Sequence, residues 1–145
     1  MVGVSGDGVM SNYLNRKTIL CIDDDDGVLE FHRALLERRG YAVLTAASAR
    51  QGLQIAAAFA VAAVVVDYRM PEMDGLEVAA EIRRIRPQVP IIMISSDVEI
   101  SGHALQAVDA FISKDEAPWR LLPMISQICG EDPSAFPENA GASVA

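Results

Sequence analysis

The chain has 145 residues, a length that predicts one domain with a substantial core rather than two domains. Its 20 acidic residues outnumber its 12 basic residues, and the net charge of −8 argues against affinity for nucleic acids or anionic lipid membranes. The longest apolar run, 55–66, has 12 residues and is shorter than the roughly 18 that a membrane-spanning helix needs.

Neither the N-terminus nor the cysteines point to an exported protein. The first residues, MVGVSGDGVMSNYLNRK, lack the charged region and the apolar stretch of a secretory signal, which predicts a cytoplasmic location. Cys21 lies within an apolar run and Cys129 near the end of the last predicted helix. These positions fit neither a disulfide framework nor a metal pair, so both residues are predicted to be core thiols.

The first predicted strand ends in a run of carboxylates. Residues 1–16 show no hydrophobic periodicity and are predicted to form a flexible arm. The apolar run 19–22 predicts a buried strand, and four aspartates, 23–26, follow it directly. One aspartate would suffice to cap the next helix. Gly40 is predicted to stop that helix, whose apolar residues recur at helical spacing: Val28, Phe31, Leu35 and Leu36.

A second strand, a second helix and a central strand come next. Residues 41–46 predict a strand and residues 49–58 predict a helix. The β-branched run 64–66 predicts a strand that is buried on both faces, and it ends at Asp67. Asp67 therefore follows a buried strand at its carboxyl end, where open α/β sheets bind ligands.

After Asp67 the chain is predicted to turn and then to form a capped helix. The Met-Pro pair at 70–71 cannot continue a strand or lead directly into a helix. Asp74 and Glu77 have the spacing of a capping box, in which each side chain accepts a hydrogen bond from the other residue's backbone. A helix is therefore predicted over 74–85.

The remaining pattern contains two strands and two helices. The apolar runs 91–94 and 110–113 predict strands, with a short helix at 100–107 between them. The last helix is predicted from about 118 to 128. The 17 residues after Ile128 show no core pattern and are too few for an output domain. The predicted organisation is thus a domain over 17–129 with a flexible tail over 130–145, acting as a stand-alone protein.

Five strands alternating with helices predict an α/β fold, in which a doubly wound parallel sheet of five strands has helices on both faces. The carboxyl ends of parallel strands meet at one edge. This edge would bring together the aspartates 23–24, Asp67, Ser95 and Lys114. Carboxylates this close repel one another unless a cation lies between them, and oxygen ligands in a partly open site suit Mg²⁺.

Four motifs together resemble the receiver domain of response regulators in two-component signalling. In chain order they are ILCIDD at 19–24, VVVDYRMPEMDG at 64–75, IIMIS at 91–95 and FISK at 111–114. The resemblance extends over most of the predicted domain. It implies a five-stranded doubly wound sheet of strand order 2-1-3-4-5.

The resemblance also implies the chemistry of the site. Asp67 would accept a phosphoryl group from a phosphohistidine of a histidine kinase or a histidine phosphotransfer protein. Asp24, Asp67 and the backbone carbonyl of Arg69 would bind Mg²⁺ directly, and Asp23 would act through a bound water. Such a protein is not an enzyme in the ordinary sense, because it assists only its own phosphorylation and dephosphorylation.

Three further residues take roles in the switch that the resemblance implies. Ser95 would supply the switch hydroxyl, Phe111 the switch aromatic ring and Lys114 the lysine of the family pattern. A downstream protein would dock on the face formed by the predicted helix 100–107, the fifth strand and the last helix. The expected state is a monomer or a weak homodimer that binds neither nucleic acid nor membrane.

The sequence departs from the family pattern between the fourth strand and the last helix. Asp115 follows Lys114, where the family usually has proline. The interval from Ser95 to Lys114 is 19 residues, about three fewer than is usual in the family, and residues 106–108 replace a small-Gly-small turn. A short or displaced helix is therefore expected at 100–107. The acidic run also offers Asp25 and Asp26 as competing cation ligands.

Two other functions fit parts of the sequence. One is a receiver-like scaffold that binds proteins without being phosphorylated. The other is a phosphatase of the haloacid-dehalogenase type, which would use Asp24 and Asp26 and would turn over aryl phosphates. The phosphatase hypothesis leaves the motif around Asp67 unexplained and lacks a second acidic pair beyond the fourth strand.

Overall fold

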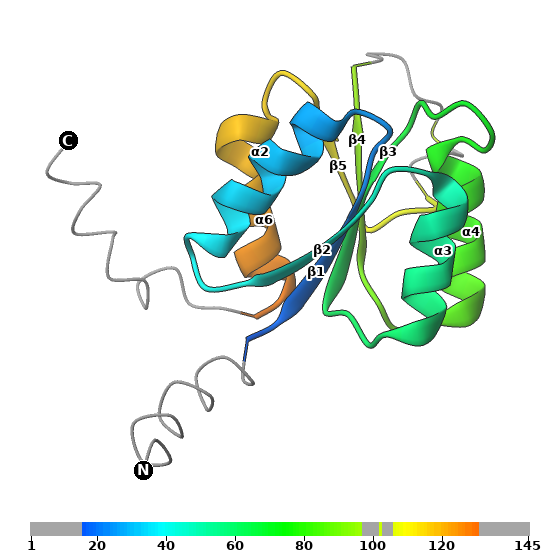
Figure 1. Ribbon diagram of the computed structural model, residues 1–145, viewed down its shortest axis with the longest axis horizontal. Helices are drawn as coiled ribbons and strands as arrows, with labels where there is room; N and C mark the ends of the chain where they lie inside the picture. The colour runs from blue at the N-terminus through cyan, green and yellow to red at the C-terminus, as the bar shows by residue number, and fades with distance from the viewer. Residues whose placement is uncertain (1–15, 97–101, 103–105, 131–145) are drawn as a thin grey trace, which may run out of the picture.

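Five parallel strands form the centre of the molecule (Figure 1). The computed structural model describes residues 16–96, 102 and 106–130. The strands lie side by side in the order β2-β1-β3-β4-β5, as the resemblance implied. Their bounds are β1 Thr18–Ile22, β2 Ala42–Ala46, β3 Ala63–Asp67, β4 Ile91–Ser95 and β5 Ala110–Ser113.

Helices cover both faces of the sheet, which confirms the predicted doubly wound α/β fold (Figure 1). Helices α2 and α6 pack on one face, and α3 and α4 pack on the other. Their bounds are α2 Asp26–Glu37, α3 Ala49–Ala58, α4 Gly75–Ile85 and α6 Ala117–Ile128. Most of the predicted helix 100–107, the predicted arm and the predicted tail lie outside the described residues.

Strand β3 is buried along its whole length, as its β-branched sequence predicts. Val65 packs with the core on the side of α2 and α6, whereas Val64 and Val66 pack with the core on the side of α3 and α4. Neighbouring strands align residue by residue, with Val66 opposite Ile22 and Asp67 opposite Ile94. The ends of β1, β3 and β4 therefore reach the same edge of the sheet.

The buried face of α2 agrees only in part with the predicted one, since Leu36 is buried and Leu35 packs against the core as expected, whereas Phe31 does not. Leu29, His32 and Leu36 face the sheet, while the Phe31 side chain is 47% exposed. Residues 28, 31 and 35 and residues 29, 32 and 36 both have helical spacing. Packing against the sheet buries the second set, which includes the His32 imidazole. Burial, with a smaller effect of Lys114 in the same direction, lowers the pKa of His32 to about 4. His32 is therefore neutral at physiological pH.

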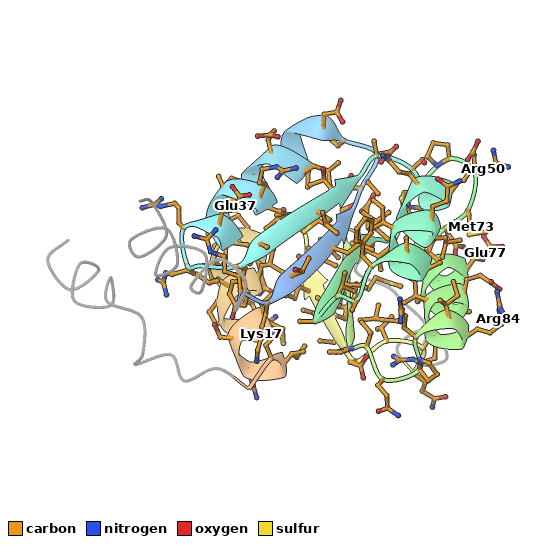
Figure 2. All side chains as sticks on the ribbon, turned by 60° about the horizontal axis from the view of Figure 1, so that its bottom comes forward. Lys17, Glu37, Arg50, Met73, Glu77 and Arg84 are labelled. Carbon is orange, nitrogen blue, oxygen red and sulfur yellow. The ribbon has the colours of Figure 1, made fainter. Side chains whose placement is uncertain are left out.

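Helix α4 begins with the predicted capping box. The Asp74 carboxylate accepts a hydrogen bond from the Glu77 backbone N–H at 3.0 Å, and the Glu77 carboxylate accepts one from the Asp74 N–H at 3.0 Å. Glu77 and Arg84 lie on the outer side of the helix (Figure 2). The capping box fixes where the loop after Asp67 ends.

The two cysteines are free thiols, and only one of them is fully in the core. Cys21 is buried in β1, and burial raises its pKa to about 12. Cys129 is only partly buried at the end of α6, where its carbonyl accepts a hydrogen bond from Lys17. Among the described residues, no helix is both long enough and apolar enough to span a bilayer.

Candidate functional site

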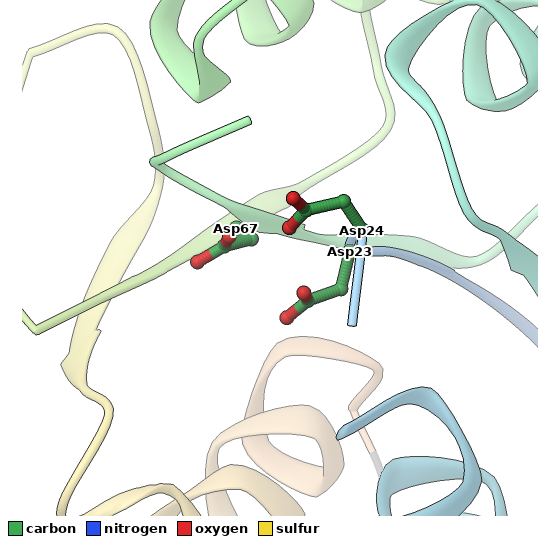
Figure 3. Close-up of side chains that lie close together, drawn as sticks. All are labelled: Asp23, Asp24 and Asp67. Atoms are coloured by element: carbon green, nitrogen blue, oxygen red, sulfur yellow. The ribbon is translucent and has the colours of Figure 1, made fainter. Parts of the chain in front are cut away.

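Three carboxylates gather at the edge of the sheet where β1 and β3 end (Figure 3). Asp23 and Asp24 directly follow β1, and Asp67 is the last residue of β3. One oxygen from each lies within 4.8 Å of the others. Asp23 and Asp67 are buried, whereas Asp24 is exposed to solvent. The parallel topology thus produces the acidic cluster that the strand ends predicted.

The four consecutive aspartates divide between two tasks. Asp23 and Asp24 belong to the acidic cluster, while Asp25 caps α2 by accepting hydrogen bonds from Gly27 N–H at 2.8 Å and from the next amide. Asp26 is exposed in the first turn of α2. Neither Asp25 nor Asp26 is part of the acidic cluster, so the expected competition for a cation is not supported by their positions. Asp24 and Asp26, the pair that the phosphatase hypothesis would use, are therefore not in the same cluster.

The buried Asp23 carboxylate is held by a local hydrogen bond. The Asp25 backbone N–H donates to Asp23 Oδ1 at 2.9 Å, and the Asp23 N–H donates to the Ala46 carbonyl at 3.1 Å. Burial raises the pKa of Asp23 to about 6, and the charge of Asp67 acts in the same direction. The cap of α2 therefore also orients a carboxylate of the site. The sequence indicated that one aspartate of the run caps α2, but it did not predict the contact of the capping residue with Asp23.

Lys114 brings a positive charge to Asp67 from the far side of β4. Its ammonium Nζ lies 3.3 Å from Asp67 Oδ1. Its backbone N–H donates to the Ser95 carbonyl at 2.9 Å, which ties the end of β5 to the end of β4. Burial raises the pKa of Asp67, although Lys114 opposes that rise. Burial lowers the pKa of Lys114, but the carboxylates of Asp67 and Asp23 more than compensate and raise it.

Ser95 and Phe111 lie on the two strands beyond Asp67. Ser95 is the last residue of β4, one position past the partner of Asp67, and it is 1% exposed. Phe111 lies on β5 opposite Met93 and is partly buried against the core on the side of α3 and α4. The sheet register thus places both residues near the end of β3. Their roles in a switch remain predictions.

The loop after Asp67 lines an open cavity of about 330 Å³ that also includes Asp24 of the acidic cluster. The Arg69 backbone N–H hydrogen-bonds the Asp67 carboxylate, and its guanidinium lies over the Tyr68 ring, 5.9 Å from the ring centre. No sequence pattern predicted this cavity. The residues that line it come from this loop and from the segment that follows β1: Asp24, Tyr68, Arg69, Met70, Pro71 and Asp74.

The donor set of the acidic cluster fits a hard divalent cation. Carboxylate oxygens from three residues lie close together, and burial raises the pKa of two of them because it disfavours their charged forms. A divalent cation would relieve this cost. The exposed Asp24 leaves room for the water ligands that Mg²⁺ retains in proteins. The site therefore suits Mg²⁺ bound through few protein ligands.

Comparisons with known proteins agree with this site and fold. The transcriptional regulatory protein GlrR of Escherichia coli is 35% identical over 99 residues, which are 66% of this chain and 22% of GlrR. The chain thus spans about a fifth of the length of that relative. A CheY-like receiver domain protein from Methanospirillum hungatei is 30% identical with a TM-score of 0.74, and the match covers 80% of this chain and 95% of that one.

A third relative was solved with ions in place. The response regulator TrrA from Thermotoga maritima, in complex with Mg²⁺ and BeF, is 27% identical with a TM-score of 0.73. That match covers 77% of this chain and 98% of TrrA. The family model of the response regulator receiver domain matches residues 19–126, which include the whole acidic cluster and Lys114. The chain therefore belongs to the response regulator receiver domain family, whose members are phosphoacceptor signalling modules rather than enzymes.

Proposed function

We propose that Asp67 accepts a phosphoryl group from a phosphohistidine of a histidine kinase or a histidine phosphotransfer protein. The observation that supports this most directly is the position of Asp67, with two carboxylates on one side and the Lys114 ammonium at 3.3 Å on the other. In this proposal Asp24, Asp67 and the Arg69 carbonyl hold Mg²⁺, and Asp23 acts through a water. The scaffold function would leave this arrangement without a use.

Transfer requires positioning and charge neutralisation more than any further covalent chemistry. The bond from phosphorus to the donor imidazole nitrogen breaks as a carboxylate oxygen of Asp67 forms its bond to phosphorus, and the electron pair stays with the imidazole. Bound Mg²⁺ would supply charge neutralisation for the phosphoryl oxygens. Lys114 adds a second positive charge at Asp67.

The same contacts give a physical basis for switching. An aspartyl phosphate adds acceptor oxygens beside Ser95, whose hydroxyl would donate to one of them. Movement of this hydroxyl would leave space into which Phe111 can turn. Phosphorylation would then change the surface formed by β5, α6 and the segment that precedes β5, where we expect a downstream protein to dock. We place these events in the cytoplasm, in a monomer or weak homodimer.

Asp67→Asn tests the phosphorylation site. The variant should abolish labelling by a purified histidine kinase or by acetyl phosphate in the presence of Mg²⁺, because the nucleophilic carboxylate is gone. Asp26→Asn is the matched control, since it removes an exposed carboxylate of the acidic run that lies outside the cluster. The control should be labelled at the wild-type rate. Labelling of Asp67→Asn at that rate would refute the assignment.

Amide chemical shifts test the proposed output surface. A phosphoryl mimic bound with Mg²⁺ should shift the signals of residues 95–120 more than those of α3. The reason is that Phe111, the proposed switch residue, lies on the edge strand β5, whereas α3 contacts β1 and β2 at the other end of the sheet. The measurement is a two-dimensional amide spectrum with and without the mimic. Larger shifts across α3 would place the output surface elsewhere.

A further inference from the structure

We propose that Gly75, the first residue of α4, is a positioning residue for the cation site. This role rests on the proposed function, because it concerns the Mg²⁺ ligands around Asp67. The Gly75 N–H donates to the Tyr68 carbonyl at 2.7 Å and so closes the loop 68–74. At the other end, the Tyr68 N–H donates to the Ile94 carbonyl at 2.9 Å. The loop is therefore fixed at both of its ends.

The start of α4 lies directly against the backbone of Asp67. A Cβ atom added at Gly75 would lie 2.6 Å from the Asp67 carbonyl oxygen and 2.8 Å from the Tyr68 Cα. Both atoms belong to the main chain, so no side-chain rotation can relieve these clashes. Gly75 does not have a positive φ, unlike Gly40 and Gly130. The position therefore requires glycine for space rather than for backbone conformation.

The backbone that would have to move carries the site. Asp67 supplies the central carboxylate, and the Arg69 N–H hydrogen-bonds that carboxylate. Ordinary contacts begin at 3.4 Å, so a Cβ at 2.6 Å requires a displacement of about 0.8 Å. Mg²⁺ demands near-octahedral geometry with oxygen distances of about 2.0–2.1 Å, and a shift of this size at a ligand is large by comparison. Close packing at Gly75 thus sets the ligand positions.

Gly75→Ala tests the proposal, with Gly52→Ala as its matched control. Gly52 also packs a helix tightly on the sheet, since an added Cβ would meet the Ile22 side chain at 2.5 Å. This contact compresses a side chain instead of the backbone at Asp67. Both variants remove a glycine at a tight contact, but only Gly75→Ala presses directly on the backbone of Asp67 and Tyr68. Mg²⁺ affinity is measured by titration calorimetry at a temperature where each variant is folded.

Gly75→Ala should bind Mg²⁺ at least tenfold more weakly than the wild type, while Gly52→Ala should stay within about twofold. Unchanged affinity in Gly75→Ala would overturn the proposal. Equal weakening in both variants would also overturn it, because the effect would then reflect general loss of stability. A wild type that binds no Mg²⁺ would instead refute the cation site of the proposed function, and the role of Gly75 with it.

Hydrogen exchange in the wild type tests the same idea without a substitution, in case Gly75→Ala does not fold. Mg²⁺ should slow exchange of the Gly75 amide several-fold more than that of Val78, whose N–H donates to the Asp74 carbonyl in the same helix. The reason is that a cation that stabilises the loop also stabilises the hydrogen bond of the Gly75 N–H that closes it. Equal slowing at the two amides would overturn the proposal.

Discussion

His32 couples the stability of the fold to pH through a single buried side chain. It is 4% exposed in α2 and lines a cavity of about 420 Å³ together with Lys114, Phe31 and Pro118. Its pKa falls from 6.5 to about 4 chiefly because burial disfavours the charged ring, and nearby Lys114 adds to the effect. The unfolded chain therefore binds a proton at a higher pH than the folded chain does.

We predict that this residue makes the protein less stable as the pH falls from 6.5 towards 4. The contribution is fully present above pH 6.5, and about 3 kcal/mol of unfolding free energy is lost by pH 4. Urea unfolding at several pH values measures it. His32→Leu should lack this loss, whereas the neighbouring Phe31→Leu should keep it. Asp23 has a raised pKa and therefore makes the protein more stable as the pH falls. It is present in all three proteins, so the difference between them reports His32.

At the scale of elements, one carboxylate ties a helix and two strands together at the edge of the sheet opposite the site. Asp109 directly precedes β5, and its Oδ2 accepts hydrogen bonds from the Ile91 N–H at 2.7 Å and from Arg83 at 2.8 Å. Burial raises the pKa of Asp109, but these hydrogen bonds more than compensate and lower it. The contact fixes where β5 starts after the shortened segment that precedes it.

Asp109→Ala should destabilise the protein more than Arg83→Ala does. Removal of the carboxylate leaves the N–H of the fully buried Ile91 without this partner, at a cost of about 1–3 kcal/mol. Removal of Arg83 breaks a partly exposed ion pair, at a cost of about 1 kcal/mol or less. Arg84→Ala, in the exposed pair with Glu81, is the control and should change stability least. Thermal unfolding that ranks Arg83→Ala above Asp109→Ala would contradict this account.

For the molecule as a whole, repulsion and burial of the carboxylates in the acidic cluster destabilise the folded state. The chain has a net charge of −8, and three of its carboxylates lie within 4.8 Å of one another. Two of these are buried where the charged form is disfavoured. A ligand that binds only the folded state and neutralises this cluster should therefore stabilise the entire domain.

Mg²⁺ should raise the melting temperature of the wild type, and it should do so much less in Asp24→Ala. The physical reason is mass action on the folded state, which depends on the ligands of the cluster. Asp26→Ala serves as the control, because this residue lies in the same acidic run but outside the cluster. The measurement is a melting curve with increasing Mg²⁺. Equal shifts in the wild type and in Asp24→Ala would count against these ligands.

Local patterns in the sequence were sufficient to predict the strands, most helix ends and the edge of the sheet at which the site forms. The β-branched run before Asp67 predicted β3, and the Asp74 and Glu77 pair predicted the start of α4, because these signals depend on local backbone preferences. Alternation of strands and helices was enough to place Asp67, Ser95 and Lys114 at one edge, since it predicts parallel strands, whose carboxyl ends all meet at the same edge of the sheet.

The different roles of residues that look equivalent in the sequence follow from packing in the folded chain. Four adjacent aspartates are alike in sequence, and packing alone places Asp23 in the cluster and Asp25 on the helix cap. Two apolar stripes of α2 have similar spacing, and the fit against the sheet buries His32 instead of Phe31. The raised pKa of Asp23 depends on its burial and on the charge of Asp67, which lies far away in the chain. The contact of Gly75 with the Asp67 backbone depends on how the loop between them folds back, so neither feature follows from a local sequence pattern.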